Sequence, residues 1–264
     1  MSNQPLLLFI FIVLVSIAGW KTRNLSVSGA VAAVLTGTAL ALAFSWQGLL
    51  VLGVFFATSS FWSKYRIRDK LAIEQKLAKT SKRDWQQVMA NGGSAMIFSF
   101  LYIWTKDASY MAGAFASISA ANADTWASEI GPLSKASPVS IKTWQRAEKG
   151  TSGAVSFLGT AASLAGALTI ALVSFVMFPE TGWKGAVLIV ITGFLGSLVD
   201  TFLGAYIQVE YMCPSCGMVT EASIHCGGKC KKVKGTYLVN NEFVNFFASL
   251  FAGAAAALLL EVII

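Results

Sequence analysis

Residues 4–20, QPLLLFIFIVLVSIAGW, form a mainly apolar run that contains no charged side chain. A helix of roughly 17–25 apolar residues spans the hydrocarbon core of a bilayer, so this run is long enough to cross one. No basic residue precedes the run, whereas Lys21 and Arg23 follow it, which is the reverse of the charge order in a secretory signal. We therefore expect a first membrane helix whose N-terminus lies outside.

Similar apolar stretches recur along the whole 264-residue chain. Including the first, the predicted spans are 4–20, 27–46, 48–62, 86–104, 108–130, 152–178, 184–206 and 242–262. The third is short, so a tilted or re-entrant segment remains an alternative there. The chain is 55% hydrophobic and only 12% charged, about half the charged fraction of a soluble globule. This composition excludes a disordered chain and an ordinary cytosolic enzyme. It predicts one all-α domain, 1–264, folded as a polytopic membrane bundle.

Basic residues are concentrated in alternate loops, which hold 18 of the 20 Lys and Arg residues. These loops are 21–26, 63–85, 131–151 and 207–241. Because Lys and Arg are enriched in cytoplasmic loops, we expect all four loops in the cytoplasm and both termini outside. The expected location is the plasma membrane of a bacterium or archaeon.

Loop 63–85 is the most basic of the four. Its cations are Lys64, Arg66, Arg68, Lys70, Lys76, Lys79, Lys82 and Arg83. Their near-helical spacing is typical of a basic amphipathic helix that lies on anionic lipid. Steering of an anionic substrate toward a site is the alternative interpretation.

Acidic residues are rare inside the predicted spans, where a charged side chain costs about 2.5–3.5 kcal/mol on the insertion scale and needs a partner or a function. Asp124 and Glu129 lie near the inner end of span 108–130, and Asp200 lies near the inner end of 184–206. We therefore expect chemistry at the cytoplasmic mouth of the bundle. Asp124 and Glu129 are about 140° apart around a regular helix, so either Glu129 faces elsewhere or the helix is broken nearby.

Loop 131–151 supplies cations at the same membrane face. Carboxylates that hold Mg²⁺, together with Lys or Arg side chains that neutralise phosphate oxygens, suit a polyphosphate substrate. The Gly-Thr-Ser-Gly sequence at 150–153 could present backbone N–H groups to a phosphate at a helix start, although its spacing is not that of a Walker motif.

Five segments resemble an integral membrane family that includes animal transmembrane protein relatives and a plant phytyl-phosphate kinase. They are Asn91-Gly92-Gly93, the run 121–131 (ANADTWASEIG), 150–156 (GTSGAVS), 196–201 (GSLVDT) and 240–246 (NNEFVNF). The resemblance covers nearly the whole chain. It implies transfer of a phosphoryl group from a nucleoside triphosphate, with CTP as a candidate donor, to a prenyl monophosphate. The partners it implies are this lipid, the nucleotide and the membrane, with no nucleic acid.

The implied reaction assigns roles to the polar residues at the inner ends of the spans. Asp124, Glu129 and Asp200 are predicted as the catalytic residues and as Mg²⁺ ligands. The predicted substrate- and phosphate-binding residues are Asn91, Asn122, Thr125, Lys142, Arg146, Lys149, Ser152, Glu242 and Asn245. Two other classes remain open: a transporter that uses intramembrane carboxylates, and a lipid cytidylyltransferase.

The cysteines all lie in loop 207–241, together with the single histidine of the chain. Disulfides are not expected in a reducing cytoplasm. Four thiolates can bind Zn²⁺ tetrahedrally, and the alternative is redox-active or unliganded thiols. The predicted zinc ligands are Cys213, Cys216, Cys226 and Cys230, with His225 as a possible replacement for one of them.

Overall fold

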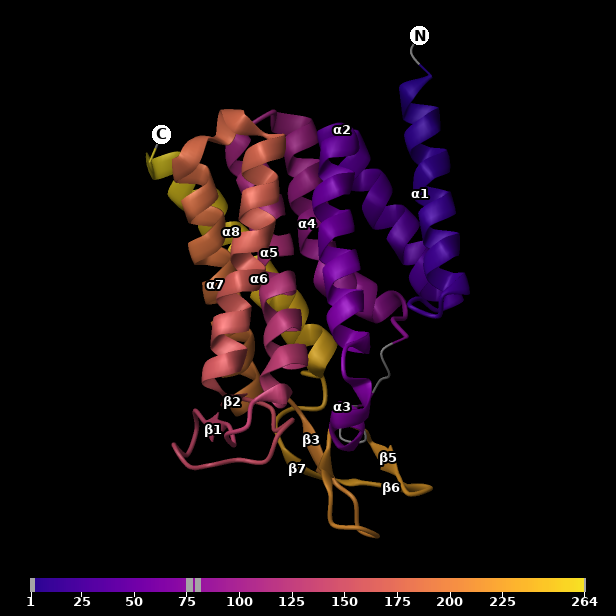
Figure 1. The fold of residues 1–264 in the computed structure, drawn as a ribbon, viewed down its shortest axis with the longest axis vertical. Helices are drawn as coiled ribbons and strands as arrows, with labels where there is room; N and C mark the ends of the chain where they lie inside the picture. The colour runs from indigo at the N-terminus through magenta and orange to yellow at the C-terminus, as the bar shows by residue number, and fades with distance from the viewer. Residues whose placement is uncertain (1–2, 75–77, 79–81, 264) are drawn as a thin grey trace.

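The computed structural model describes residues 3–74, 78 and 82–263 and consists of a bundle of long helices with short strands at one end (Figure 1). The helices are α1 (Gln4–Lys21), α2 (Val27–Lys64), α3 (Ile67–Glu74), α4 (Trp85–Thr105), α5 (Ala108–Ile130), α6 (Phe157–Met177), α7 (Gly182–Tyr206) and α8 (Asn241–Ile263). Two 3-10 turns, η1 (Gly131–Leu133) and η2 (Pro179–Thr181), lie in the loops. The all-α membrane bundle predicted from the sequence is confirmed.

The strands form three small antiparallel sheets in the loops at that end. β1 (Val139–Ser140) pairs with β2 (Ala154–Val155). β3 (Glu210–Met212) lies between β4 (Val219–Thr220) and β7 (Lys231–Lys234). β5 (Ile224–His225) pairs with β6 (Gly228–Lys229). Each sheet joins segments within a single loop, so the sheets order the loops and leave the helices to form the core.

Helix α2 contains a sharp break at Ser45, where φ is 56° and ψ is −150°. The chain reverses direction there, because Gly37 lies within van der Waals reach of Leu49 although a continuous helix would separate them by about 18 Å. The two arms of α2 therefore cross the bundle in opposite directions, as the separate spans 27–46 and 48–62 predict (Figure 1). With α1 and α4–α8, the helices make eight passes.

Five of the described helices, namely α1, α2, α6, α7 and α8, are long and apolar enough to cross a membrane by length and composition alone. Helix α5 is different because it lies at the centre of the bundle. Every residue from Met111 to Ala123 is buried. It packs against α4, α6, α7 and α8. Other helices therefore surround α5, whereas the outer helices contact lipid, and for this reason α5 can be less apolar than they are.

Small side chains allow the neighbours of α5 to approach it closely. A Cβ atom at Gly193 of α7 would lie 2.6 Å from the Cβ atom of Ser119. A Cβ atom at Gly166 of α6 would lie 3.1 Å from the Cα atom of Ala123. Helices in a bilayer associate through such packing. The glycines on α6 and α7 therefore fix where the inner end of α5 lies.

Helix α6 begins later than the sequence predicts. The predicted span started at residue 152, but the helix starts at Phe157, and the Ser156 hydroxyl accepts a hydrogen bond from the Gly159 N–H at 3.1 Å. Serine favours this N-cap position because its oxygen satisfies an otherwise unpaired donor. Gly153 has a left-handed φ of 74° and cannot continue a helix. The Gly-Thr-Ser-Gly sequence thus forms a loop beside β2, which corrects its expected position at a helix start.

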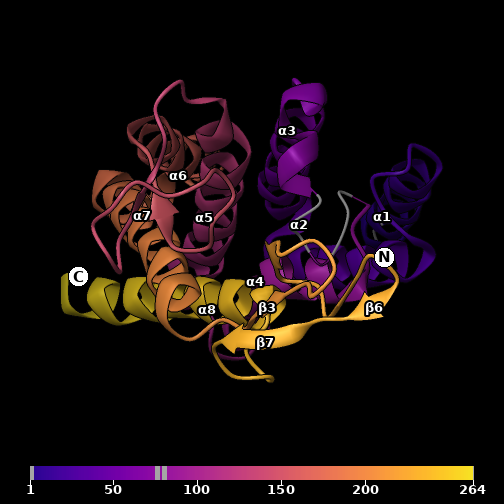
Figure 2. The same ribbon diagram turned by 90° about the horizontal axis from the view of Figure 1, so that it is seen from below.

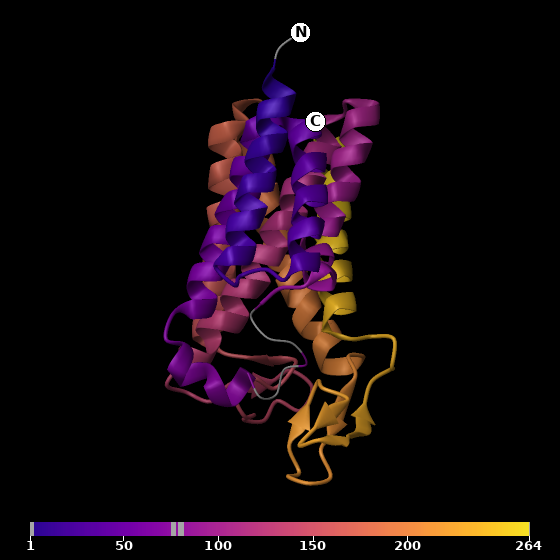
Figure 3. The ribbon, with the colours of Figure 1, turned by 90° about the vertical axis from the view of Figure 1, so that its right-hand side faces the viewer.

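The basic loops gather at one end of the bundle, and both termini lie at the other (Figures 1 and 3). Viewed from that loop end, α1 lies at the outer edge beside α2 (Figure 2). In loop 63–85, α3 forms part of the expected amphipathic helix, but Lys70 is buried and points into the protein. Lys76 and Lys79 lie outside the described residues.

We predict that Gly193→Ala destabilises the bundle by about 1–3 kcal/mol, because the added methyl group overlaps the Ser119 side chain. Gly53→Ala is the matched control within a membrane helix, since a Cβ atom there meets nothing within 4 Å. Thermal unfolding of both variants in the same detergent measures the difference. Equal midpoints for Gly193→Ala and Gly53→Ala would contradict the packing described here.

Candidate functional site

A polar cavity of about 340 Å³ lies at the loop end of the bundle. The ends of α5, α7 and α8 on this side form its walls together with residues of the loops 131–156 and 207–221. Its charged lining side chains are Lys70, Arg83, Asp124, Glu129, Lys149, Asp200 and Glu221. The cavity therefore brings four carboxylates and three cations together from segments far apart in the sequence.

Asp124 of α5 and Asp200 of α7 both line this cavity, and the negative charge of Asp124 acts on Asp200. With its side-chain amide oriented to satisfy both neighbours, Asn245 of α8 donates to Oδ2 of Asp200 at 2.8 Å and to the Asn241 carbonyl at 3.2 Å. Three helices thus present polar groups to one place. Asp124, Asp200 and Asn245 therefore all line the same cavity.

The residues that follow the two aspartates adopt matching positions. The Thr125 hydroxyl donates to the Ala121 carbonyl at 2.8 Å, and the Thr201 hydroxyl donates to the Ser197 carbonyl at 3.0 Å. Both threonines line the cavity. The Asp-Thr pairs at 124–125 and 200–201 therefore occupy the same position relative to their helices.

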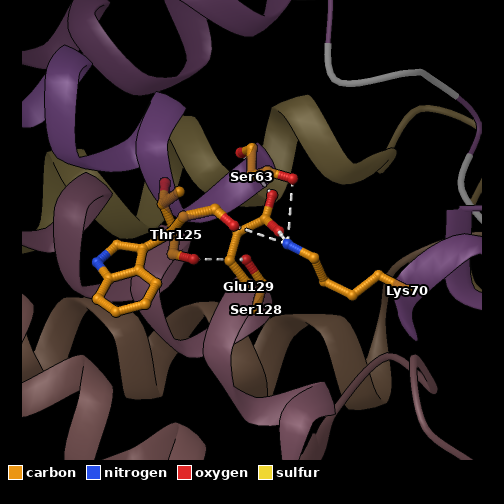
Figure 4. Close-up of polar contacts among 6 residues, drawn as sticks. Ser63, Lys70, Thr125, Ser128 and Glu129 are labelled. Carbon is orange, nitrogen blue, oxygen red and sulfur yellow. Dashed lines mark hydrogen bonds and ion pairs between the residues drawn. The ribbon is translucent and has the colours of Figure 1, made fainter. Parts of the chain in front are cut away.

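Glu129 also lines the cavity, and its carboxylate contacts residues at the end of α2 and in α3. Its Oε2 atom pairs with Lys70 Nζ at 2.6 Å, and its Oε1 atom accepts a hydrogen bond from the Ser63 hydroxyl at 2.6 Å (Figure 4). Lys70 Nζ also donates to the carbonyls of Trp62 at 2.7 Å and Ser63 at 3.1 Å. Helix α5 is continuous to Ile130, so it is not broken between Asp124 and Glu129. The Glu129 carboxylate instead turns toward Lys70 and Ser63.

This contact changes the expected role of Glu129. Both of its carboxylate oxygens already have close partners, and one partner is a buried cation. A metal ion would have to displace Lys70, whose charge would then lack a partner in the protein interior, which is costly. In the structure, Glu129 therefore links the end of α5 to α2 and α3.

Arg83 lines the cavity where loop 63–85 meets α4. Its Nη1 donates to the Ser60 hydroxyl at 3.1 Å, and its guanidinium lies 5.7 Å from the ring centre of Phe56. Burial lowers the pKa of Arg83, while the charge of Glu129 raises it. The sequence analysis counted Lys70 and Arg83 as loop charges and did not place either in the site.

Glu221 is an acidic residue of the site that the sequence analysis missed. Gln208 Nε2 donates to its Oε1 at 2.7 Å, and the Ser152 hydroxyl lies 3.3 Å from Gln208 Oε1. Burial raises the pKa of Glu221 to about 7, and the nearby charge of Glu242 acts in the same direction. The negative charge of Glu221 also acts on Asp200. Glu221 thus joins Asp124 and Asp200 in the lining of the cavity.

Other predicted binding residues differ in their relation to the cavity. Lys149 lines it and donates to the Ser134 carbonyl at 2.6 Å, and Ser152 lines it as well. Lys142 and Arg146 are exposed on the loop, outside the lining, and Arg146 donates to the Ser137 carbonyl at 2.8 Å. These two cations therefore do not join Lys149 in lining the polar cavity.

Three predicted polar residues lie elsewhere. Asn122 is fully buried, donates to the Gly166 carbonyl at 2.8 Å and accepts from the Thr58 hydroxyl at 3.1 Å, so it joins helices. Asn91 lines a separate apolar cavity. Glu242 lines a neighbouring pocket that it shares with Glu221. None of the three lines the polar cavity.

The cysteine-rich loop gathers Cys213, Cys216, Cys226 and His225, whose ligand atoms all lie within 4.8 Å of one another. His225 Nδ1 is 3.5 Å from the Cys216 sulfur and 3.3 Å from the Cys226 sulfur. These separations suit a tetrahedral Zn²⁺ with thiolate and imidazole ligands. Cys230, named as the fourth ligand in the sequence analysis, lies near Cys213 but outside this group.

Comparison with known proteins identifies relatives across most of the chain. The family described as "Integral membrane protein DUF92" matches residues 10–253. Protein PGR of Arabidopsis thaliana is 30% identical over 280 residues, which cover 95% of each chain. An uncharacterized membrane protein of Methanocaldococcus jannaschii is 29% identical over 90% of this chain and 87% of its own. Protein VTE6, chloroplastic, of Arabidopsis thaliana is 26% identical over 70% of this chain and 57% of its own. No solved structure matches significantly.

The raised pKa of Glu221 gives a pH-dependent stability. Because the folded state holds this proton more tightly than the unfolded chain, Glu221 stabilises the fold below about pH 4.5 and loses that contribution as pH rises to about 7. In metal-free protein, Glu221→Gln should raise the melting temperature at pH 8 and change it little at pH 4.5. A shift of equal size at both pH values would show that Glu221 does not titrate in this range.

Proposed function

The chain belongs to the integral membrane family DUF92, and from this premise we propose that it is a membrane-embedded prenyl-phosphate kinase. The sequence resembles a family that includes a plant phytyl-phosphate kinase. The enzyme would transfer a phosphoryl group from a nucleoside triphosphate, with CTP as a candidate donor, to an isoprenoid monophosphate. The observation that carries the proposal is the cavity itself, in which carboxylates and cations meet at the membrane edge.

The acids of the cavity fit a magnesium ion. Asp124 and Asp200 face the same space, Glu221 lies close enough to act on Asp200, and the Asn245 amide adjoins them. Carboxylate oxygens are the ligands Mg²⁺ prefers beside phosphate oxygens and water. We propose Asp124, Asp200 and Glu221 as the residues that hold Mg²⁺. The ion would bring the donor phosphates to this site and neutralise charge on them.

The cations and the acceptor complete the chemistry. A phosphate oxygen of the prenyl monophosphate would attack the γ-phosphorus, the bond from that phosphorus to the β–γ bridging oxygen would break, and the nucleoside diphosphate would leave. The acceptor oxygen is already anionic at neutral pH, so the step needs no strong base and depends on positioning and charge neutralisation. Arg83 and Lys149 lie on the cavity wall where they can neutralise phosphate oxygens.

The proposed orientation places the cavity in the cytoplasm. The four loops that hold most of the basic residues lie at the cavity end of the bundle (Figure 3), and basic loops are retained on the cytoplasmic side. A nucleoside triphosphate would reach the cavity from the cytosol. The phosphate of a prenyl lipid in the plasma membrane would lie at the same level.

We predict that Asp124→Asn and Asp200→Asn each lower kcat by a factor on the order of 10²–10³, because each removes charge that holds the metal at the transferring phosphate. Asp107→Asn, at the opposite end of α5, is the matched control and should keep full activity. Purified protein is incubated with Mg²⁺, each nucleoside triphosphate and a series of prenyl monophosphates, and lipid products are identified by mass.

The same assay separates the kinase from the alternatives. Release of nucleoside diphosphate supports the kinase, whereas release of pyrophosphate with a nucleotide-linked lipid would identify a cytidylyltransferase. Near wild-type turnover by both aspartate variants would remove the proposed metal site. A protein that forms no lipid product with any donor would refute the kinase proposal.

We also propose that the cysteine-rich loop binds structural Zn²⁺ through Cys213, Cys216, His225 and Cys226. Two of these ligands lie in the turn that joins β3 to β4. Gln208 precedes β3 and Glu221 follows β4, and the two side chains are bonded to each other at the cavity wall. A bound ion would therefore stabilise the hairpin that supplies Glu221. Four protein ligands would close the coordination shell, so this ion would not take part in catalysis.

Metal content tests the revised ligand set. Cys216→Ser and His225→Ala are expected to lose zinc from purified protein, because each removes one of the four ligands. Cys230→Ser is the matched control and should retain it. Mass spectrometry of metals in the three variants and the wild type gives the readout. Loss of zinc in Cys230→Ser with retention in His225→Ala would restore the all-cysteine set, and a zinc-free wild type would end the proposal.

A further inference from the structure

A second, apolar cavity of about 500 Å³ lies between α1 and the two arms of α2. Its walls are almost entirely hydrocarbon, from side chains such as Leu8, Phe11, Ile12, Trp46, Leu49 and Phe56. Its volume lies within the range of roughly 300–1,000 Å³ that is usual for ligand sites. The break at Ser45 creates the space, because it turns the two arms of α2 into a hairpin against which α1 packs at one side.

The apolar and polar cavities meet at two residues. Arg83 and Gln87 line both of them. The Arg83 guanidinium lies over the ring of Phe56, which lines the apolar cavity, while Ser60 accepts its hydrogen bond. A cation therefore lies between the hydrocarbon-lined space and the space that holds Asp124 and Asp200.

We propose that the α1–α2 cavity binds the hydrocarbon tail of a prenyl monophosphate whose phosphate lies at Arg83. This inference rests on the proposed kinase function and names the place of its lipid substrate. The charge at the junction matches a phosphate, and the apolar walls match an isoprenoid chain. A tail in this cavity would direct the phosphate toward the polar cavity, where the donor phosphates would bind. The depth of the cavity would then limit the chain length of the substrate.

Gly53 allows a direct test, because it lines the apolar cavity and a Cβ atom there meets nothing within 4 Å. In Gly53→Phe, the added ring would fill space meant for the tail without displacing backbone. The ratio of kcat/KM for geranylgeranyl monophosphate to that for dimethylallyl monophosphate should fall by about tenfold or more, equivalent to 1.4 kcal/mol of lost binding. Leu168→Phe, on the exposed face of α6, is the control and should leave the ratio unchanged.

A binding measurement makes the result independent of turnover. A geranylgeranyl monophosphate analogue with a diazirine at the tail end is photolysed with the full-length protein without nucleotide, and the labelled peptides are identified by mass spectrometry. We expect labels in α1 and α2 that unlabelled prenyl monophosphate displaces and that Gly53→Phe reduces. A photoreactive phosphatidylcholine serves as the bulk-lipid control and should not label the same residues to the same extent.

The outcomes separate this inference from the proposed function. Displaceable labels in α1 and α2 without any phosphoryl transfer would keep the lipid site and refute the kinase. Phosphoryl transfer with labels confined to other helices would refute the α1–α2 cavity as the tail site. Equal labelling by phosphatidylcholine would show that the cavity holds only bulk lipid, and an unchanged chain-length ratio in Gly53→Phe would contradict the proposal as well.

Discussion

The close packing of α6, α7 and α8 around α5 is the constraint on which the rest of the structure depends. The hydrophobic effect does not drive helices together inside a bilayer, so contact between small residues must do so. Gly193 lies against Ser119, and the hydroxyls of Ser163 and Ser197 join α6 to α7 at 2.9 Å. Asp200 lies two turns beyond Gly193 along α7. Asp124 and Asp200 come to the same cavity because the backbones of α5 and α7 pack closely along the preceding turns.

Charge balance in the cavity favours a divalent cation. Four carboxylates face three cations, and the pair between Lys70 and Glu129 neutralises one of each. Three carboxylates, Asp124, Asp200 and Glu221, then remain beside Arg83 and Lys149. A bound Mg²⁺ ion would balance charge on these carboxylates and attract the donor phosphates. Lys70 and Glu129 contribute differently, since their ion pair links α3 to the end of α5 (Figure 4).

Much of the fold could be predicted from sequence because hydropathy is a local property. Helices α5 and α7 end at Ile130 and Tyr206, as the predicted spans do, so the positions of Asp124 and Asp200 near these ends could be predicted as well. The direction of a loop side chain depends on tertiary contacts, and for this reason Lys70 and Arg83 were identified only as loop charges. Glu221 gave no signal at all, since its position depends on the fold of the cysteine-rich loop. The fold of the same loop decides whether Cys230 or His225 groups with the other three cysteines.

The buried interior of the bundle bears on the choice between the proposed enzyme and a transporter. A transporter needs a polar path that opens in turn to each side of the membrane. Beyond Asp124, toward the end of the bundle that holds the termini, the described core is closed by packed apolar side chains such as Phe44, Phe115 and Phe178. An amphipathic lipid does not need such a path, because its phosphate lies at the membrane surface while its tail stays in hydrocarbon. The arrangement of a polar cavity beside an apolar one therefore favours chemistry at one membrane face over passage through the bundle.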